Sequence, residues 1–271
     1  MTAEGQLAVD VRALSGQPNP GFESISAPAV FQSAAWFQGS LFMAGPAGLF
    51  AWSPEGVLEH VYRPGQDFPA AALGQIAVGM LADARKPELL IATTGEGVLA
   101  FDGTGFRQIL PANADARRVT ALLPLSSGRL LLGTERLGLL VYDGHVLREF
   151  HPTTNKVYVT ALAGSEANLW IGTIHSGLLH WRGGETETIG TAQGLPDERV
   201  ECLATDGDRV FAGTPVGVAE LQGGSVARVL AAGRFARALA VDGDWLLVGQ
   251  MERGVARVSL AGPAAGSGLR R

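Results

Sequence analysis

The sequence predicts an all-β protein, a six-bladed β-propeller of four-stranded antiparallel blades. Three observations lead to this prediction: one motif recurs along the chain, short apolar runs alternate with turn residues, and glycine and proline are abundant. The 37 glycines and 14 prolines among 271 residues exceed the usual share and indicate frequent turns. With 46% hydrophobic and only 17% charged residues, the chain is too apolar to remain unfolded in water.

The recurring motif is a short apolar run that contains a small residue near its end. Its six copies are Leu41–Gly45, Leu89–Thr93, Leu130–Thr134, Leu169–Thr173, Val210–Thr214 and Leu246–Gln250. Successive copies lie about forty residues apart, which is the period expected for a propeller blade of four strands.

Each repeat divides into four short strands, most clearly in the third copy. Its predicted strands are Val119–Pro124, Arg129–Thr134, Gly138–Tyr142 and Val146–Phe150. The segments Ser126-Ser127-Gly128 and Asp143-Gly144 are tight-turn signals between strands. The first and second strands are nearly continuous apolar runs, so we expect neighbouring blades to cover both of their faces.

A glycine follows the second strand of each repeat, and a large apolar residue comes four positions later. The glycines are Gly48, Gly97, Gly138, Gly177, Gly217 and Gly254. The apolar residues are Trp52, Phe101, Tyr142, Trp181, Leu221 and Val258. We interpret this second column as packing between blades, because a repeated aromatic position in a propeller serves that purpose.

The ends of the chain predict how the propeller closes. The six repeats occupy residues 30–260, and the last of them ends at Leu260 without a fourth strand, whereas Leu7 to Leu14 form an extra strand pattern before the first repeat. We therefore expect one domain over residues 1–262, with a closing strand in 1–15, a linker in 16–29 and a disordered tail in 263–271. The closing strand would remove two open sheet edges.

Repeats three to five resemble a known repeat family. Gly194–Leu203 followed by Val210–Thr214 is similar to the two-component regulator propeller repeat, and so are Val159–Leu162, Asn168–Thr173 and Gly177–Leu179. The resemblance implies a sensor-type bacterial propeller that binds ligands, often carbohydrates, without performing chemistry. In that family the propellers are usually extracytoplasmic.

Charge and end composition exclude several classes of protein. The net charge of -5 argues against a nucleic-acid footprint, which needs a clustered positive surface. The start of the chain has Glu4 where a signal peptide carries basic residues, and no run approaches the ~18 apolar residues of a membrane span. We therefore expect a cytoplasmic protein without a membrane span. The single cysteine, Cys202, permits neither an internal disulfide nor a cysteine metal cluster.

Candidate binding residues lie in two sets of loops that a propeller brings to one face: those between the second and third strands, and those between blades. From these loops and the adjoining strand ends we select Arg118, Glu135, Arg136, Tyr158, His175, Arg199, Glu201, Arg237, Glu252 and Arg253 as residues that bind a ligand or partner. The same loops also hold Asp67, Glu96, Asp115, Arg117, Asn155, Lys156, Asp197 and Arg234. The loops of the opposite face are mostly short glycine turns, which backbone geometry explains.

Two polar columns lie on the predicted strands. The first is expected to face the channel and consists of Gln32, Thr120, Thr160, Glu201 and Arg237. Glu201 and Arg237 lie in adjacent blades and could form an ion pair that satisfies both groups. Alternatively, they form the polar floor of a ligand site in which Arg237 holds an anion or a hydroxyl-rich molecule. The second column, His180, Glu220 and Arg257, is predicted to face neighbouring blades as satisfied core polar groups.

Catalytic patterns are weak in this sequence. The five histidines lack metal-ligand spacing, Ser176 lacks a nucleophile-elbow sequence, and Cys202 lies among apolar residues. We therefore predict no catalytic residue, metal or cofactor. The preferred function is a non-catalytic binding or scaffold propeller that recognises a protein partner or a small polar ligand. A hydrolase or lyase at the channel mouth and a carbohydrate-sensing domain remain open alternatives.

Overall fold

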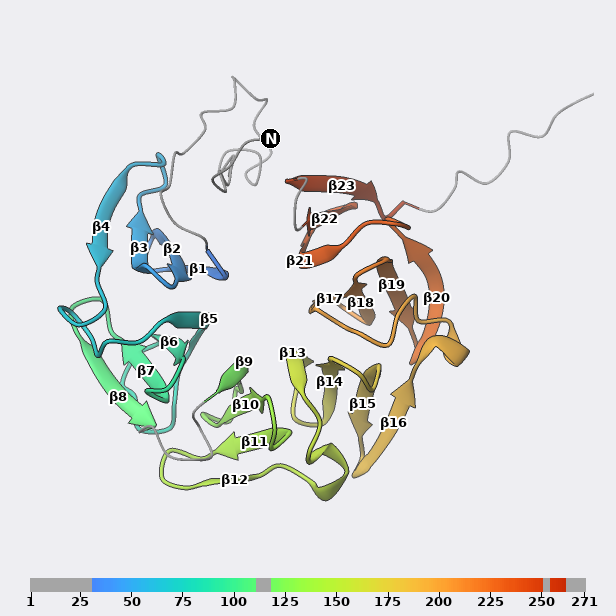
Figure 1. The fold of residues 1–271 in the computed structure, drawn as a ribbon, viewed down its shortest axis with the longest axis horizontal. Helices are drawn as coiled ribbons and strands as arrows, with labels where there is room; N and C mark the ends of the chain where they lie inside the picture. Colours follow the sequence, from blue (N-terminus) through green and yellow to red (C-terminus); the bar gives the residue numbers. More distant parts are fainter. Residues whose placement is uncertain (1–30, 111–117, 251–253, 262–271) are drawn as a thin grey trace, which may run out of the picture. The chain divides into compact units, whose positions relative to one another are not determined.

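A computed structural model describes residues 31–110, 118–250 and 254–261 (Figure 1). The described strands form six antiparallel sheets, five with four strands and one with three, and the fold is a six-bladed β-propeller. The fold class predicted from the sequence is therefore confirmed. The chain divides into two compact units, Met1–Glu166 and Ala167–Arg271.

The first unit contains three complete blades and the first strand of the fourth. Its strands are β1 (Ser33–Phe37), β2 (Ser40–Gly45), β3 (Gly48–Trp52), β4 (Leu58–Tyr62), β5 (Leu73–Gly79), β6 (Glu88–Thr93), β7 (Val98–Phe101), β8 (Phe106–Leu110), β9 (Val119–Pro124), β10 (Leu130–Thr134), β11 (Leu139–Tyr142), β12 (Leu147–Glu149) and β13 (Val159–Gly164). A 3-10 turn, Pro152–Thr154, precedes β13.

The second unit contains the remaining strands of the fourth blade and the last two blades. Its strands are β14 (Asn168–Thr173), β15 (Leu178–Arg182), β16 (Glu185–Ile189), β17 (Cys202–Asp206), β18 (Arg209–Thr214), β19 (Gly217–Gln222), β20 (Ser225–Leu230), β21 (Ala236–Asp242), β22 (Trp245–Gln250) and β23 (Val255–Ser259). Each sheet follows chain order, for example β17-β18-β19-β20. A second 3-10 turn, Thr191–Gln193, precedes β17.

The third blade matches its predicted strands closely. Val119–Pro124 is strand β9, and the other three strands begin and end within one residue of the predicted bounds. The second strands are apolar because they are covered on both sides: every residue of β6 and β10 is buried. The outer strands, such as β4 and β12, are largely exposed.

The core lies between neighbouring sheets. In the first unit, Phe37 and Leu49 of the first blade pack with Leu89 and Phe101 of the second. In the second unit, Phe211 of the fifth blade packs with residues of the sixth sheet. Interdigitation of this kind makes each blade depend on the next for burial of its apolar surface.

The predicted inter-blade column is buried in most blades. Trp52, Phe101, Tyr142 and Leu221 are each at most 8% exposed. Trp181 and Val258 are only half-buried.

The glycine column has a backbone explanation. Gly138 has φ +80°, and a Cβ there would lie 1.9 Å from the Thr154 carbonyl oxygen. Gly177 has φ +69°, and a Cβ at this position would lie 2.4 Å from the Ile189 carbonyl oxygen. Only glycine combines this backbone conformation with so close an approach of a neighbouring carbonyl group.

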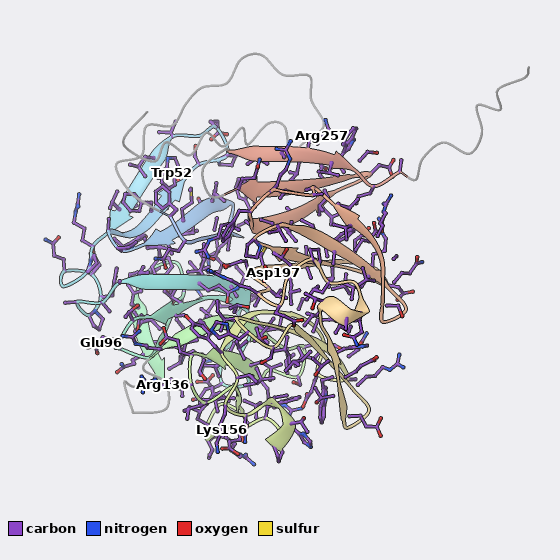
Figure 2. The ribbon with its side chains drawn as sticks, turned by 45° about the vertical axis from the view of Figure 1, so that its right-hand side comes forward. Trp52, Glu96, Arg136, Lys156, Asp197 and Arg257 are labelled. Carbon is purple, nitrogen blue, oxygen red and sulfur yellow. The ribbon has the colours of Figure 1, made fainter. Side chains whose placement is uncertain are left out.

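The second polar column is only partly as predicted. His180 and Glu220 are buried and have partners: His180 Nε2 lies 2.6 Å from Asn168 Oδ1, and Glu220 Oε2 lies 2.5 Å from Arg228 Nε. Arg257, which is labelled in Figure 2, is exposed. Its guanidinium carbon lies 4.1 Å from the centroid of the Trp245 ring. The expectation of a buried core position is wrong for Arg257, because β23 is the outermost described strand of its sheet.

Several predictions fall outside the described residues. The closing strand Leu7 to Leu14, the linker 16–29 and the tail 263–271 all lie there, so these assignments and the single-domain boundary stay predictions. Among the described residues, no helix has the length and apolar character needed to cross a bilayer.

Candidate functional site

Within each unit, the two predicted sets of loops lie side by side. In the first unit, the Glu135 N–H donates to the Arg118 carbonyl, 3.3 Å away, and thus joins a loop between strands to a connection between blades. In the second unit, the Gly177 N–H donates to the Glu198 carbonyl at 2.9 Å, and Gly233 N–H to the Val216 carbonyl at 2.8 Å. The loops that hold the candidate residues are therefore tied to one another by backbone hydrogen bonds.

A recurring threonine, which the sequence analysis did not single out, fixes the loop after the second strand. In four blades its hydroxyl donates to the carbonyl of the column glycine at 2.7 to 2.8 Å; these residues are Thr93, Thr134, Thr173 and Thr214. Each hydroxyl also accepts a loop N–H, as from Ser176 at 2.8 Å. The signal was present as a threonine that ends four of the six motif copies. These threonines are at most 3% exposed, so they hold the loops from within.

The central candidate in the second unit is a cluster of two arginines around one glutamate. The Glu201 side chain is only 4% exposed, and its Oε2 accepts a hydrogen bond from Arg237 Nη1 at 2.5 Å. Arg199 Nε forms an ion pair with the other carboxylate oxygen. The side chains of Arg199 and Arg237 are 43% and 54% exposed. Glu201 and Arg237, which the sequence analysis considered as a pair, are thus joined by a third residue.

Strands place this cluster. Glu201 immediately precedes β17, and its N–H donates to the Gly213 carbonyl in β18 at 2.7 Å. Arg237 belongs to β21, which packs beside β17. Arg199 lies two residues before Glu201 in the chain, and its N–H donates to Asp197 Oδ1 at 2.8 Å. Burial of a carboxylate costs several kcal/mol, and pairing with a guanidinium group offsets part of this cost.

Donors remain on both guanidinium groups. Arg237 Nη1 donates a hydrogen bond to Glu201, whereas Arg199 Nε contacts Glu201 Oε1 as an ion pair without hydrogen-bond geometry. In the described part of the chain, no acceptor contacts the other N–H groups of either side chain. The Arg199 guanidinium carbon also lies 5.7 Å from the centroid of the Phe235 ring, which supports it from one side.

A second group of predicted residues meets in the first unit. Arg118 Nη1 donates to both carboxylate oxygens of Glu135, at 3.2 and 3.1 Å, and the Tyr158 hydroxyl donates to Glu135 Oε1 at 3.4 Å. The Arg118 side chain is 65% exposed, so this pair contributes little to stability. The group instead combines an exposed arginine with a half-buried tyrosine.

The other selected residues are dispersed. Arg136 and His175 are exposed loop residues, and Glu252 and Arg253 lie outside the described residues. Figure 2 labels Glu96, Arg136 and Lys156, which lie on three separate loops of the first unit. In the predicted channel column, Gln32 is exposed and the Thr120 hydroxyl donates to the Val159 carbonyl at 2.5 Å. The structure thus joins Arg199 with Glu201 and Arg237, and Arg118 with Glu135 and Tyr158.

The cysteine beside the cluster is unreactive. Burial, followed by the neighbouring Glu201 carboxylate, raises the pKa of the Cys202 thiol to about 12. Its Sγ donates weakly to the Ala236 carbonyl, 3.6 Å away. Since the thiolate is the nucleophilic form, the Cys202 thiol is not a nucleophile at neutral pH. Among the described residues, no group of three or more His, Cys, Asp and Glu side chains is arranged to hold a metal ion.

Comparisons with known proteins support the fold. No family model matches the chain, and no curated protein matches it. The extracellular domain of the hybrid two-component system protein BT4673 from B. thetaiotaomicron is similar in structure, with a TM-score of 0.69 and 14% identity over 86% of this chain and 35% of that one. The present chain therefore spans about a third of that domain's length.

Two further solved structures are similar. The WD40 repeats of RRP9 give a TM-score of 0.63 at 15% identity, covering 89% of this chain and 82% of that one. The computationally designed protein Ika8 gives 0.61 at 16% identity, covering 87% and 72%. Identities this low establish likeness of fold. The predicted resemblance to propellers of two-component systems is confirmed at that level.

Proposed function

We propose that the protein is a non-catalytic binding propeller that recognises a small polar ligand at its loop-rich face, centred on Arg199, Glu201 and Arg237. The observation that carries this proposal is the buried Glu201 carboxylate, which holds two half-exposed guanidinium groups in place. A purely structural ion pair needs one cation for one carboxylate. Here a second arginine is fixed at the surface with donors to spare.

Preorganisation supports a binding role. An arginine side chain normally loses rotamer entropy when it binds a ligand, and this loss weakens binding. Arg199 and Arg237 are already held by Glu201, and Arg199 also by Phe235. A ligand that reaches them therefore orders less of the protein, and more of the interaction free energy appears as affinity.

Thermal shift measurements on a library of polar metabolites test this proposal. A ligand that binds only the folded protein raises its Tm by mass action. We expect hits whose Tm increase is reduced in Arg237→Lys and unchanged in Arg182→Ala, which removes an exposed arginine at the end of β15. Mass spectrometry of each hit after incubation should return it unaltered. A chemically converted hit, or hits indifferent to Arg237→Lys, would contradict the proposal.

A protein partner is the second candidate, and the group in the first unit favours it. Arg118 is 65% exposed and shares Glu135 as a partner with Tyr158, and arginine and tyrosine are enriched at the centres of protein interfaces. Capture from a native extract with the wild type and with Arg118→Glu tests this. A stoichiometric partner that is retained by the wild type and lost on charge reversal supports an interface there; equal capture by both contradicts it.

The compartment is part of the proposal. The sequence predicts a cytoplasmic protein, whereas the BT4673 structure is of an extracellular domain, where a sensing role would operate. Cell fractionation of the native protein distinguishes these two settings, and with them the intracellular binding role from the sensing alternative.

A further inference from the structure

We infer that the Arg199–Glu201–Arg237 cluster binds an oxyanion, the carboxylate or phosphate group of a small ligand. This inference rests on the proposed function, because it names the ligand class of the same site. The two guanidinium groups and one carboxylate leave one positive charge in excess, on side chains that are about half exposed.

Nearby carboxylates are engaged elsewhere. Asp197 Oδ1 accepts the Arg199 backbone N–H. Glu198 Oε1 accepts the Thr191 N–H at 2.7 Å and the Thr191 hydroxyl at 2.8 Å. These hydrogen bonds lower the pKa of Glu198, so its carboxylate remains ionised and tied to the loop. Among the described residues, only Glu201 pairs with Arg199 and Arg237.

The arrangement suits a ligand with several oxygens on one centre. Each guanidinium contacts a different oxygen of Glu201, so both cations lie beside a single carboxylate. A carboxylate or phosphate group has enough acceptors to bond both arginines at once, and arginine forks match this geometry.

Other ligand classes fit less well. A cation would meet the excess positive charge. A neutral hydroxyl group can accept a hydrogen bond from an arginine, but it does not compensate the excess positive charge and cannot form the two parallel bonds that a carboxylate or phosphate forms with one guanidinium group. Nucleic acid would need a broader positive surface than this cluster supplies, on a chain whose net charge is -5.

The experiment titrates the full chain with inorganic phosphate and, separately, with acetate, replacing chloride at constant ionic strength. The arginine Nε–H signals are followed by ¹⁵N NMR and assigned with Arg199→Lys and Arg237→Lys. We expect saturable shifts of the Arg199 and Arg237 signals with at least one anion. Arg237→Lys keeps the charge beside Glu201 but loses the planar fork, so binding should weaken about tenfold.

Arg182→Ala provides the matched control, because it removes one positive charge away from the cluster and should leave the affinity unchanged. Saturation by phosphate alone assigns a phosphate-type ligand, and saturation by acetate alone assigns a carboxylate. Shifts that grow linearly with both anions, or equal weakening in Arg182→Ala, overturn the inference. If a neutral library hit shifts the same two signals while both anions fail, the inference is wrong and the proposed function stands. If neither the anions nor any library hit shifts the Arg199 and Arg237 signals, both the inference and the proposed function are wrong.

Discussion

Glu201 is the residue on which the candidate site depends. Its carboxylate is almost fully buried and faces two cations, so replacing it with the neutral isostere in Glu201→Gln removes both ion pairs. We expect the free energy of unfolding to fall by about 1.5–3 kcal/mol, the usual range for hydrogen bonds to charged groups, toward the low end because both arginines are half exposed. Urea denaturation measures this. In the control variant, Glu185→Gln at an exposed position, the free energy of unfolding should stay within about 0.5 kcal/mol of the wild type. Equal losses in the two variants would mean that the ion pairs of Glu201 do not stabilise the fold.

His180 predicts a pH dependence of stability. Its ring stacks on Trp170 with centroids 3.7 Å apart, and its Nε2 lies 2.6 Å from Asn168 Oδ1. Burial, and then the charge of Arg182, lower the pKa of His180 in the folded protein. The unfolded chain therefore takes up a proton first, near the ordinary pKa of about 6.5, and stability falls as the pH drops below that value.

Urea denaturation of the wild type and of His180→Phe at neutral and mildly acidic pH tests this dependence. Phenylalanine preserves the aromatic stack but does not titrate, so the variant should lose less stability on acidification than the wild type. An identical loss in both proteins would show that other groups set the pH dependence.

Single residues also show where sequence reasoning reaches its limit. Glu201 and Arg237 were recognised as possible partners because a blade repeat aligns their positions. Arg199 was assigned to the same loop set, but its contact with Glu201 depends on the turn that Asp197 fixes, which spacing does not reveal. Arg257 was expected to be buried by analogy with His180 and Glu220, yet no described strand covers β23.

The buried threonine at the end of the second strand is expected to stabilise its blade. In Thr173→Val, a side chain of similar shape replaces the hydroxyl that donates to the Gly177 carbonyl and accepts the Ser176 N–H. The site is buried, so these groups lose a partner where water is excluded, and we expect a loss of about 1–3 kcal/mol. The exposed Thr188→Val in the same blade should change the stability by less than about 0.5 kcal/mol.

Hydrogen exchange separates a local effect from a global one. In Thr173→Val the Ser176 amide should exchange faster than in the wild type even under conditions that favour the native state, because its acceptor is removed. Unaltered protection of Ser176 would mean that the loop is held by other contacts.

The strands were the part of this structure that the sequence predicted best. The strands of the third blade lie within one residue of their predicted bounds because turn residues punctuate each apolar run. The threonine that ends four second strands could have been recognised from the same alignment of repeats. The hydrogen bonds of this threonine could not be predicted, because they depend on a loop conformation that brings the carbonyl of the column glycine to the hydroxyl group.

At the scale of the whole molecule, the periodic sequence determines the fold, whereas the candidate binding residues lie in loops that differ from blade to blade. The low identity to BT4673, RRP9 and Ika8 illustrates this: apolar pattern and turn positions suffice for the propeller, and many side chains satisfy them. The Arg199–Glu201–Arg237 cluster belongs to particular blades, so the repeat pattern does not identify a ligand for it.

The last sheet leads to a prediction for the whole chain. It has three described strands, and its outer strand β23 exposes residues such as Val255, which is 58% exposed. An open strand edge is a template for pairing with other chains. The sequence predicts that Leu7 to Leu14 provide the fourth strand. Deletion of residues 1–14 should therefore lower the Tm and promote self-association, as measured by thermal unfolding and size-exclusion chromatography. Deletion of 263–271, the predicted tail, should change neither. A 1–14 deletion that remains monomeric with the Tm of the full chain would mean that this segment does not complete the sheet.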